Sequence, residues 1–324
     1  MSVFQLRRRS MPRRASAGQT ALVPKAWLTL DADAWTLAGV EQQGLHAHEW
    51  YRNEAEPRTW LFKPGRPERH RAIGEEIVEK LASELARLVG VPAARVELAA
   101  KGAVRGVLVE DARPPDWVLQ HGKVLMSEAL EAYDSEGQQN RGHSPASVQV
   151  ALKRFSSPPT FDLPPDFLAF DVFAGYLIFD ALIAHVDRHD RNWAVLVSPP
   201  GSDLPDALCA SFDHAASLGF TESEERLAAH LRDGALARWA LKGKARRFEH
   251  APGTPWQTLV ALAGDASRLC RDEVRTYWID RLLSVDRDSV VDVVSSAPDL
   301  ADVALEFVVE LVMVNRGRLL DELS

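Results

Sequence analysis

The sequence is poor in several features that would place it in a specialised class. It has two cysteines, Cys209 and Cys270, which lie far apart and show no metal-ligand spacing. This predicts no disulfide framework and suits a reducing compartment, so we expect a cytoplasmic protein. No apolar run reaches the length of about 20 residues that a membrane helix needs. The net charge of -8 leaves no excess of positive charge for nucleic-acid binding. These absences favour a globular protein that uses neither a membrane nor a specific nucleic acid.

The composition along the chain indicates three parts. Residues 1–20 carry five arginines among small polar residues, which predicts a disordered basic tail, with a docking arm as the alternative. This segment lacks the apolar core of a signal peptide. Short, Trp-rich segments broken by Gly and Pro follow, and the Pro-rich stretch 113–115 then interrupts the pattern. We predict a sheet-rich N-lobe over 21–112 and a helical C-lobe over 113–324.

One polar stretch lies between a hydrophobic helix and a strand. The segment His185–Asn192 follows the apolar run 166–184 and precedes the apolar run 193–197. It places two imidazoles, two carboxylates, two guanidiniums and one amide in eight residues, which is more polar groups than a core junction needs. Its spacing, H-x-D-x-x-x-x-N, is that of a kinase catalytic loop. We therefore predict that this segment is the chemical centre.

A lysine and a glutamate-rich helix lie earlier in the chain. Residues 58–64 are typical of a strand that ends near Lys63. Residues 75–89 carry apolar side chains along one stripe, which predicts an amphipathic helix ended by Gly90. Kinases build a Lys–Glu ion pair from such a strand and helix, and the lysine then meets the nucleotide phosphates. Lys63 is the candidate lysine, and the candidate partners are Glu75, Glu76, Glu79 and Glu84.

A second carboxylate follows a predicted hairpin. The apolar segments 193–197 and 207–212 are joined by a loop rich in Pro and Gly, and Asp213 comes directly afterwards. Phosphoryl transfer needs a positioned hydroxyl and cations on the phosphate oxygens. In a kinase site of this kind, Asp187 would accept the proton of the acceptor hydroxyl. Asn192 and Asp213 supply oxygens to Mg²⁺, which prefers one or two carboxylates together with phosphate oxygens and water.

Other functions could use the same residues. His185, Asp187 and His189 could be ligands in a zinc or two-metal hydrolase, although they lie where the helix should end and no further histidine cluster occurs. The loop could also be a structural turn in a nucleotide-binding regulatory module or an inactive kinase. A lipid or small-molecule kinase would share the nucleotide residues, although the chain has no basic amphipathic segment of the kind that binds membranes.

Taken together, these motifs resemble the HipA-like serine/threonine kinases, a kinase-fold family whose namesake is a toxin of a toxin–antitoxin pair. The similarity spans about residues 40–322 and is most specific at 60–64, 74–92, 179–196 and 211–219. The family's catalytic loop reads N-T-D-x-H-x-x-N, which Val186–Asn192 matches at the aspartate, histidine and asparagine. The resemblance implies ATP as phosphoryl donor. It also implies Asp187 as base, Asn192 and Asp213 as metal ligands, Lys63 and Glu79 as the nucleotide-binding pair, and His185 and His189 as supports of the loop.

The sequence departs from this family in two ways. It resembles a compact version without the extra N-terminal subdomain of the full-length toxins. Family members often have a phosphate-binding loop rich in serine or glycine, whereas the corresponding segment 41–49 has one glycine, Gly44, and no serine. Gly44 is therefore the predicted nucleotide contact of this loop, and self-inhibition through a phosphorylated serine there is not expected.

These inferences predict an α+β protein with a bilobal protein-kinase-like fold. We expect ATP and Mg²⁺ to bind between a small sheet-rich N-lobe and a larger, mainly helical C-lobe. The expected reaction is transfer of the γ-phosphate to a Ser or Thr hydroxyl of a protein substrate. The resemblance adds an antitoxin as a candidate partner.

Overall fold

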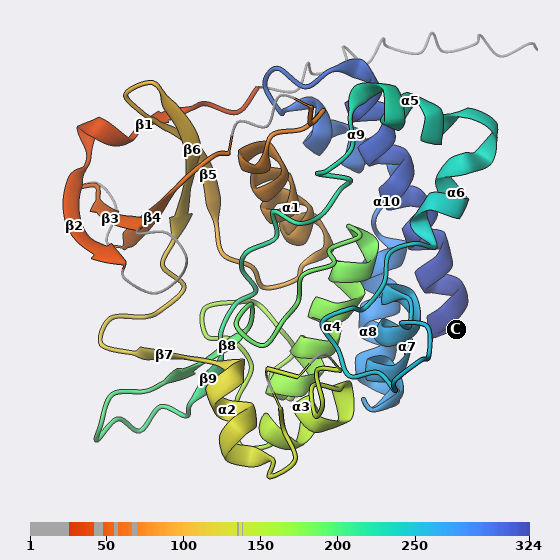
Figure 1. Ribbon diagram of the computed structural model, residues 1–324. Helices are drawn as coiled ribbons and strands as arrows, with labels where there is room; N and C mark the ends of the chain where they lie inside the picture. The colour runs from red at the N-terminus through yellow and green to blue at the C-terminus, as the bar shows by residue number, and fades with distance from the viewer. Residues whose placement is uncertain (1–25, 42–47, 55–57, 67–69, 135, 138) are drawn as a thin grey trace, which may run out of the picture.

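The computed structural model describes residues 26–41, 48–54, 58–66, 70–134, 136–137 and 139–324. The predicted basic tail at 1–20 and the predicted nucleotide contact Gly44 lie outside these residues. Within the described chain, a curled sheet forms the N-terminal part and helices form most of the C-terminal part (Figure 1). The predicted α+β class is confirmed.

Six strands form the N-terminal sheet in the order β1-β5-β6-β4-β3-β2. Their bounds are Leu30–Asp31 (β1), Thr36–Glu41 (β2), His48–Arg52 (β3), Thr59–Pro64 (β4), Val96–Lys101 (β5) and Val104–Glu110 (β6), and a short 3₁₀ helix, Ala32–Ala34, follows β1. The β1–β5 pair is parallel, and the other neighbouring strands are antiparallel. The predicted strand at 58–64 is thus an inner strand, β4, held between β3 and β6.

The side-chain alternation of β4 decides which way Lys63 points. Trp60 and Phe62 are buried in a small apolar cluster on one face of the sheet. Leu61 packs instead against the main core, to which the helix α1 (Glu75–Val89) belongs. Successive side chains of a strand point to opposite faces, so Lys63 shares the face of Leu61. The lysine is therefore directed toward α1 and the helical part.

The helix α1 has the predicted bounds. Its apolar stripe, which includes Ile77, Leu81 and Leu85, is buried against β5 and β6. The helix ends at Gly90, whose φ of +82° favours glycine because a side chain there would be strained. The Gly90 N–H donates to the Ala86 carbonyl and satisfies one of the carbonyls at the helix end.

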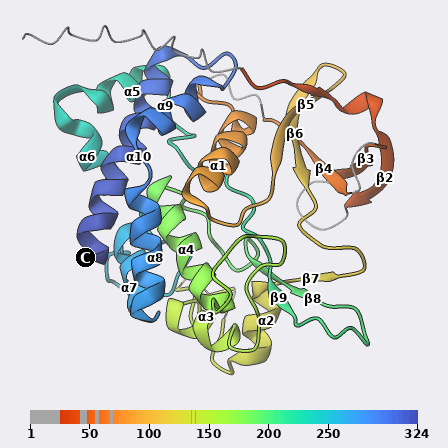
Figure 2. The ribbon, with the colours of Figure 1, turned by 180° about the vertical axis from the view of Figure 1, so that it is seen from behind.

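The helical part surrounds one almost wholly apolar helix. Every residue of α4 (Ala169–Leu182) is buried, and α7 and α10 pack against it (Figure 2). This confirms the prediction of a core helix immediately before the polar segment. The other helices that follow are α5 (Glu224–Leu231), α6 (Ala235–Ala240), α7 (Leu259–Arg268), α8 (Asp272–Leu283), α9 (Arg287–Ser295) and α10 (Asp302–Leu323), with a 3₁₀ turn at Arg232–Gly234. Among the described residues, no helix is long and apolar enough to cross a bilayer.

A second, three-stranded sheet lies below the N-terminal sheet in the view of Figure 1 and packs against α4. It has the order β7-β8-β9, with bounds Val118–His121, Ala194–Val197 and Ala207–Leu208. The hairpin β8–β9 was predicted, but β9 is shorter than the expected 207–212. After β9 the chain pairs differently: Ser211 forms a parallel bridge with Ala93 in the connection between α1 and β5. The stretch 113–115 joins the two sheets, and its role as lobe boundary stays a prediction.

The composition of 131–165, which is polar and rich in Ser, Pro and Gly, predicts a mobile insertion around a short helix at 146–153. A short helix, α3 (Pro145–Ala151), is present. However, His143, Leu152 and Phe155 are buried in the helical part. The sequence did not predict β7 or the helix that follows it, α2 (Gly122–Ala129), because neither segment has a strong hydrophobic period.

Candidate active site

Lys63 and Asp213 form an ion pair between the two parts of the chain. The Lys63 Nζ lies 3.1 Å from the Asp213 Oδ1. Burial alone lowers the pKa of Lys63, but the charges of Asp213 and Glu79 outweigh this and raise it. The Lys63 charge lowers the pKa of Asp213 and outweighs the opposing effect of desolvation. Both groups are therefore charged, and the Asp213 side chain is still 44% exposed, so its carboxylate remains open to a ligand.

Glu79 lies beside this pair without a direct ion pair to the lysine. Its side chain is buried in α1, and its Oε1 accepts a hydrogen bond of 3.2 Å from the backbone N–H of His214. Burial raises the pKa of Glu79, whereas the Lys63 charge opposes this rise. The structure thus differs from the expected direct Lys–Glu contact. Because Lys63 pairs with Asp213, Glu79 instead accepts a hydrogen bond from the backbone that follows Asp213.

Asp213 has an unusual backbone conformation. Its φ is +61°, in the left-handed region that aspartate tolerates better than most residues other than glycine. Two backbone hydrogen bonds fix the chain just before it: the Ser211 N–H donates to the Pro92 carbonyl, and the Ala94 N–H donates to the Ser211 carbonyl. The connection after α1 therefore positions the Asp213 turn. Strained residues of this kind often occur at functional sites.

The polar segment begins where α4 ends. Ala184, with a φ of +54°, turns the chain out of the helix, and the His185 N–H then donates to the Asp180 carbonyl. The Val186 N–H donates to the Ala216 carbonyl, three residues beyond Asp213. The segment is therefore tied by its backbone to the chain that carries the Asp213 carboxylate.

A buried guanidinium supports the polar segment from inside. Arg188 binds both carboxylate oxygens of Asp180, at 2.8 and 2.6 Å, and each side chain is only 2% exposed. The same guanidinium donates to the Asn192 carbonyl at 2.6 Å and to the Ser211 Oγ at 2.8 Å. It thus joins α4, the end of the polar segment and the chain leading to Asp213. The sequence indicates that Asp180 needs a cationic partner such as Arg188, because Asp180 is a lone acidic residue near the end of an apolar helix.

Asn192 and Asp213 each keep an oxygen available for a metal ion. The Asn192 Nδ2 donates to the Asp187 carbonyl at 2.8 Å, and its Oδ1 has no hydrogen-bond partner among the residues that the structure describes. The Asp213 Oδ1 receives the lysine, which leaves its Oδ2. One carboxylate and one amide oxygen suit Mg²⁺, which completes its shell with phosphate oxygens and water. The two residues therefore fit the predicted ion.

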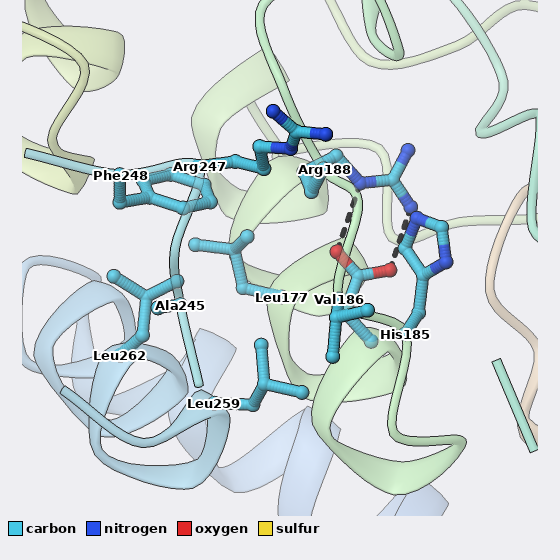
Figure 3. Close-up of a pocket in the computed structure, with 10 residues that line it drawn as sticks. Leu177, His185, Val186, Arg188, Ala245, Arg247, Phe248, Leu259 and Leu262 are labelled. Atoms are coloured by element: carbon cyan, nitrogen blue, oxygen red, sulfur yellow. Dashed lines mark hydrogen bonds and ion pairs between the residues drawn. The ribbon is translucent and has the colours of Figure 1, made fainter. Parts of the chain in front are cut away.

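The two histidines of the segment have different surroundings. His185 is fully buried, and neither ring nitrogen bonds to a residue that the structure describes. Beside the ring is a cavity with room for about one water molecule (Figure 3). His189 is partly exposed, and its Nδ1 accepts a bond of 3.1 Å from the Arg191 N–H. Within the described ranges, no group of three or more His, Cys, Asp or Glu could hold a metal ion. The hypothesis of a zinc or two-metal hydrolase therefore gains no support.

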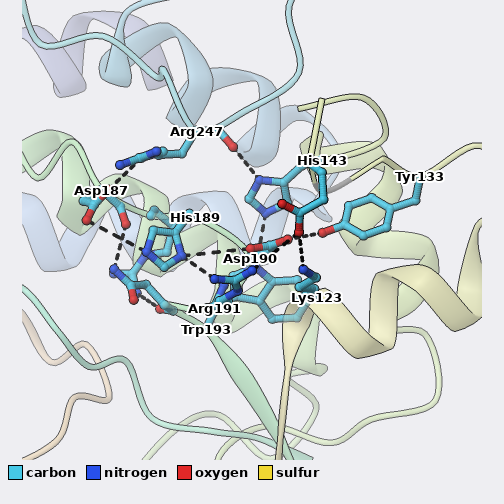
Figure 4. Close-up of polar contacts among 12 residues, drawn as sticks. Lys123, Tyr133, His143, Asp187, His189, Asp190, Arg191, Trp193 and Arg247 are labelled. Carbon is cyan, nitrogen blue, oxygen red and sulfur yellow. Dashed lines mark hydrogen bonds and ion pairs between the residues drawn. The ribbon is translucent and has the colours of Figure 1, made fainter. Parts of the chain in front are cut away.

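The candidate base Asp187 has a partner that the sequence did not reveal. The Arg247 Nε donates to the Asp187 Oδ1 at 2.6 Å (Figure 4). Arg247 lies sixty residues further along, in the irregular segment between α6 and α7. No periodicity or motif singled it out, and only the fold brings it to the polar segment.

No protein-family model matches the chain, and no curated protein matches it by sequence. Among solved structures, the chain is similar to the proinflammatory kinase CtkA of Helicobacter pylori. That match has a TM-score of 0.65 and 13% identity, and covers 91% of this chain and 97% of the other. A second similarity is to the toxin–antitoxin system of Shewanella oneidensis MR-1, in a complex of HipA, HipB and operator DNA. Here the TM-score is 0.40 at 13% identity, over 95% of this chain and 67% of the other. The first match shows that the chain has a kinase-like fold, as its resemblance to the HipA-like kinases predicted.

Proposed function

We propose that the protein is an ATP- and Mg²⁺-dependent kinase that phosphorylates Ser or Thr hydroxyls of a protein substrate. The observation that carries this proposal is the ion pair between Lys63 and Asp213. It joins an inner strand of the N-terminal sheet to the chain that is hydrogen-bonded to the polar segment of Asp187 and Asn192. Phosphoryl transfer needs this set of groups in one place.

Each residue has a role that its surroundings support. Lys63 is positively charged and would neutralise phosphate oxygens of ATP, while Asp213 and Asn192 would hold Mg²⁺. When bound, the ion would offset negative charge on the phosphates. Asp187 would accept the proton of the acceptor hydroxyl, because its Oδ2 makes no hydrogen bond within the described chain. Glu79 would keep the Asp213 turn in position.

The choice of a protein acceptor rests on the sequence resemblance to the HipA-like kinases. A lipid or small-molecule kinase would use the same nucleotide residues and remains the alternative. An antitoxin partner also follows only from that resemblance. A nucleotide-binding module without turnover would have the same cluster but would transfer no phosphate.

Nucleotide binding and transfer test this function together. Purified protein should show a rise in melting temperature with ATP and Mg²⁺, and no comparable rise with Zn²⁺ or Mn²⁺ alone. With γ-labelled ATP it should label a protein in a cell lysate, and the Asp187→Asn variant should not. Failure of the wild type both to bind ATP and to label any protein would refute the kinase assignment. Binding without transfer to any protein or lipid acceptor would indicate the regulatory module.

A further inference from the structure

Arg247 occupies a position that the proposed roles above leave unexplained. It contacts the candidate base through Nε, the nitrogen along the side of the guanidinium. Its two Nη groups make no hydrogen bond to a residue that the structure describes, and half of the side chain is exposed. A guanidinium has five N–H donors in a rigid fork, so four donors remain available beside Asp187.

The backbone around Arg247 is firmly held. The Arg247 carbonyl accepts a bond of 2.6 Å from the His143 Nδ1, and the Trp193 Nε1 donates to the His143 Nε2 at 3.2 Å. Because Nε2 accepts, Nδ1 must carry the proton, and burial lowers the pKa of His143, which favours this neutral form. The buried ring of Phe248 stacks on His143 with ring centres 4.4 Å apart.

Further hydrogen bonds join the segment 140–143 to the segment 246–249. The Asn140 Nδ2 donates to the Arg246 carbonyl at 2.8 Å, and the Glu249 N–H donates to the His143 carbonyl at 2.8 Å. The two bonds flank Arg247 on either side. Trp193 comes directly after Asn192, so the hydrogen-bond chain that fixes Arg247 starts at the end of the polar segment itself. The backbone of Arg247 is therefore fixed beside the polar segment, within reach of Asp187.

We propose, on the basis of the kinase function proposed above, that Arg247 is a catalytic residue. Its Nη donors bind the transferring phosphoryl group, and its Nε orients Asp187. The acceptor oxygen attacks the γ-phosphorus while the bond to the β,γ-bridging oxygen breaks. The hydroxyl proton moves to the Asp187 Oδ2, and ADP leaves with the electron pair. Arg247 exchanges no atom, and its charge offsets the negative charge on the transferring oxygens, as arginines do in other phosphoryl transfers.

An opposite role is conceivable for the same contact. An arginine on the catalytic base could restrain it until a substrate displaces the side chain. The structure favours the catalytic role for two reasons. The Arg247 backbone is held by a buried stack and several hydrogen bonds, so the guanidinium stays within reach of the site when a substrate binds. In addition, Arg247 binds only Oδ1. Within the described chain, the other ion-pair contact of Asp187 runs from its Oδ2 to the His189 Nε2, at 3.9 Å, which leaves Oδ2 without a hydrogen bond.

The two roles predict opposite effects of removing the guanidinium. The Arg247→Ala variant should lose at least about a hundredfold in kcat, the scale of a lost donor to transition-state charge. Free guanidinium ion added to this variant should restore part of the activity. Arg246→Ala is the matched control, because Arg246 lies over the ring of Trp256 and should leave kcat near the wild-type value. An Arg247→Ala enzyme as active as wild type, or more active, would overturn the proposal.

If the Arg247→Ala variant loses activity and guanidinium does not restore it, a binding measurement distinguishes contact with the γ-phosphate from a merely structural role. Wild type and Arg247→Ala are titrated with Mg-ADP and with the non-hydrolysable β,γ-imido analogue of Mg-ATP. If Arg247 meets the γ-phosphate, the variant loses preference for the triphosphate while its affinity for ADP stays the same. An unchanged preference would show a merely structural role and contradict the proposal. A wild type that binds neither nucleotide would instead refute the proposed function, independently of the variant.

Discussion

Lys63 and Asp213 are 150 residues apart in the sequence, and their Nζ and Oδ1 atoms lie 3.1 Å apart in the structure. The contact joins the N-terminal sheet to the chain that follows the second sheet. Each partner comes from a rigid setting, since β4 is an inner strand and the Asp213 turn is bonded to the connection after α1. The lysine is thus fixed in place before a nucleotide arrives.

Replacing this lysine should reduce ATP affinity and turnover. Lys63→Met removes the cation that would meet the phosphates and leaves Asp213 without its partner, so kcat/KM for ATP should fall by about a hundredfold or more. Lys101→Met is a suitable control, because Lys101 lies in the same sheet and pairs with Glu49 at the surface. ATP binding by calorimetry and steady-state kinetics provide the measurement. Equal losses in both variants would argue against a specific role for Lys63.

Removing the candidate base should affect the chemical step and not nucleotide binding. Asp187→Asn keeps the shape of the side chain but cannot take up the hydroxyl proton at neutral pH. We expect kcat to fall by roughly 10² to 10⁴, the usual contribution of a general base, with an unchanged dissociation constant for Mg-ATP. Asp203→Asn, in the exposed β8–β9 loop, serves as the control. A variant with unchanged kcat would mean that another group accepts the proton.

The carboxyl of Glu79 should lower stability at neutral pH. Burial raises its pKa in the folded protein, so the folded state holds the proton more tightly than the unfolded chain does. The associated stability is fully present below the unfolded pKa and is lost as the pH rises through the folded pKa. The free energy of unfolding should therefore decline more steeply in wild type than in Glu79→Gln as the pH rises above the ordinary glutamate value of about 4.3. Urea unfolding at several pH values measures this, and parallel curves would contradict it.

Replacing only one partner of the buried ion pair between Asp180 and Arg188 should markedly lower the free energy of unfolding. Arg188→Met leaves a carboxylate buried without its cation, and a loss of roughly 3–5 kcal/mol in the free energy of unfolding is expected. The double variant with Asp180→Leu should lose less than the sum of the two single variants, because no unpaired charge remains. Denaturant unfolding of the four proteins gives the coupling energy. Additive losses would show that the pair is not coupled.

The sequence predicted the elements whose hydrophobic period is strong. Helix α1 was expected at its observed bounds, because its apolar stripe and Gly90 both mark its limits. The apolar run before the polar segment likewise became α4. The end of β9 was misplaced, because Ser211 is buried by pairing with Ala93 rather than within the hairpin. That pairing depends on a residue 118 positions away, which no local pattern can indicate.

The candidate site was predictable only in part for the same reason. The residues within H-x-D-x-x-x-x-N could be identified from their spacing, and Lys63 and Asp213 from their places next to predicted strands. The contacts among them could not: Lys63 binds Asp213 instead of Glu79, and Arg247 reaches Asp187 from an irregular segment. A side chain that acts from a loop has neither a period nor a fixed spacing to the groups it meets.

Identification of a phosphorylated acceptor is the most decisive test of the proposed kinase function. Lysate proteins are incubated with the enzyme, Mg²⁺ and ATP labelled with ¹⁸O in the γ-phosphate, and modified peptides are read by mass spectrometry. The proposed kinase function predicts labelled phosphoserine or phosphothreonine with wild type and none with Asp213→Asn, which lacks the anionic metal ligand. Label that appears only in inorganic phosphate, or equal labelling by the two proteins, would contradict it.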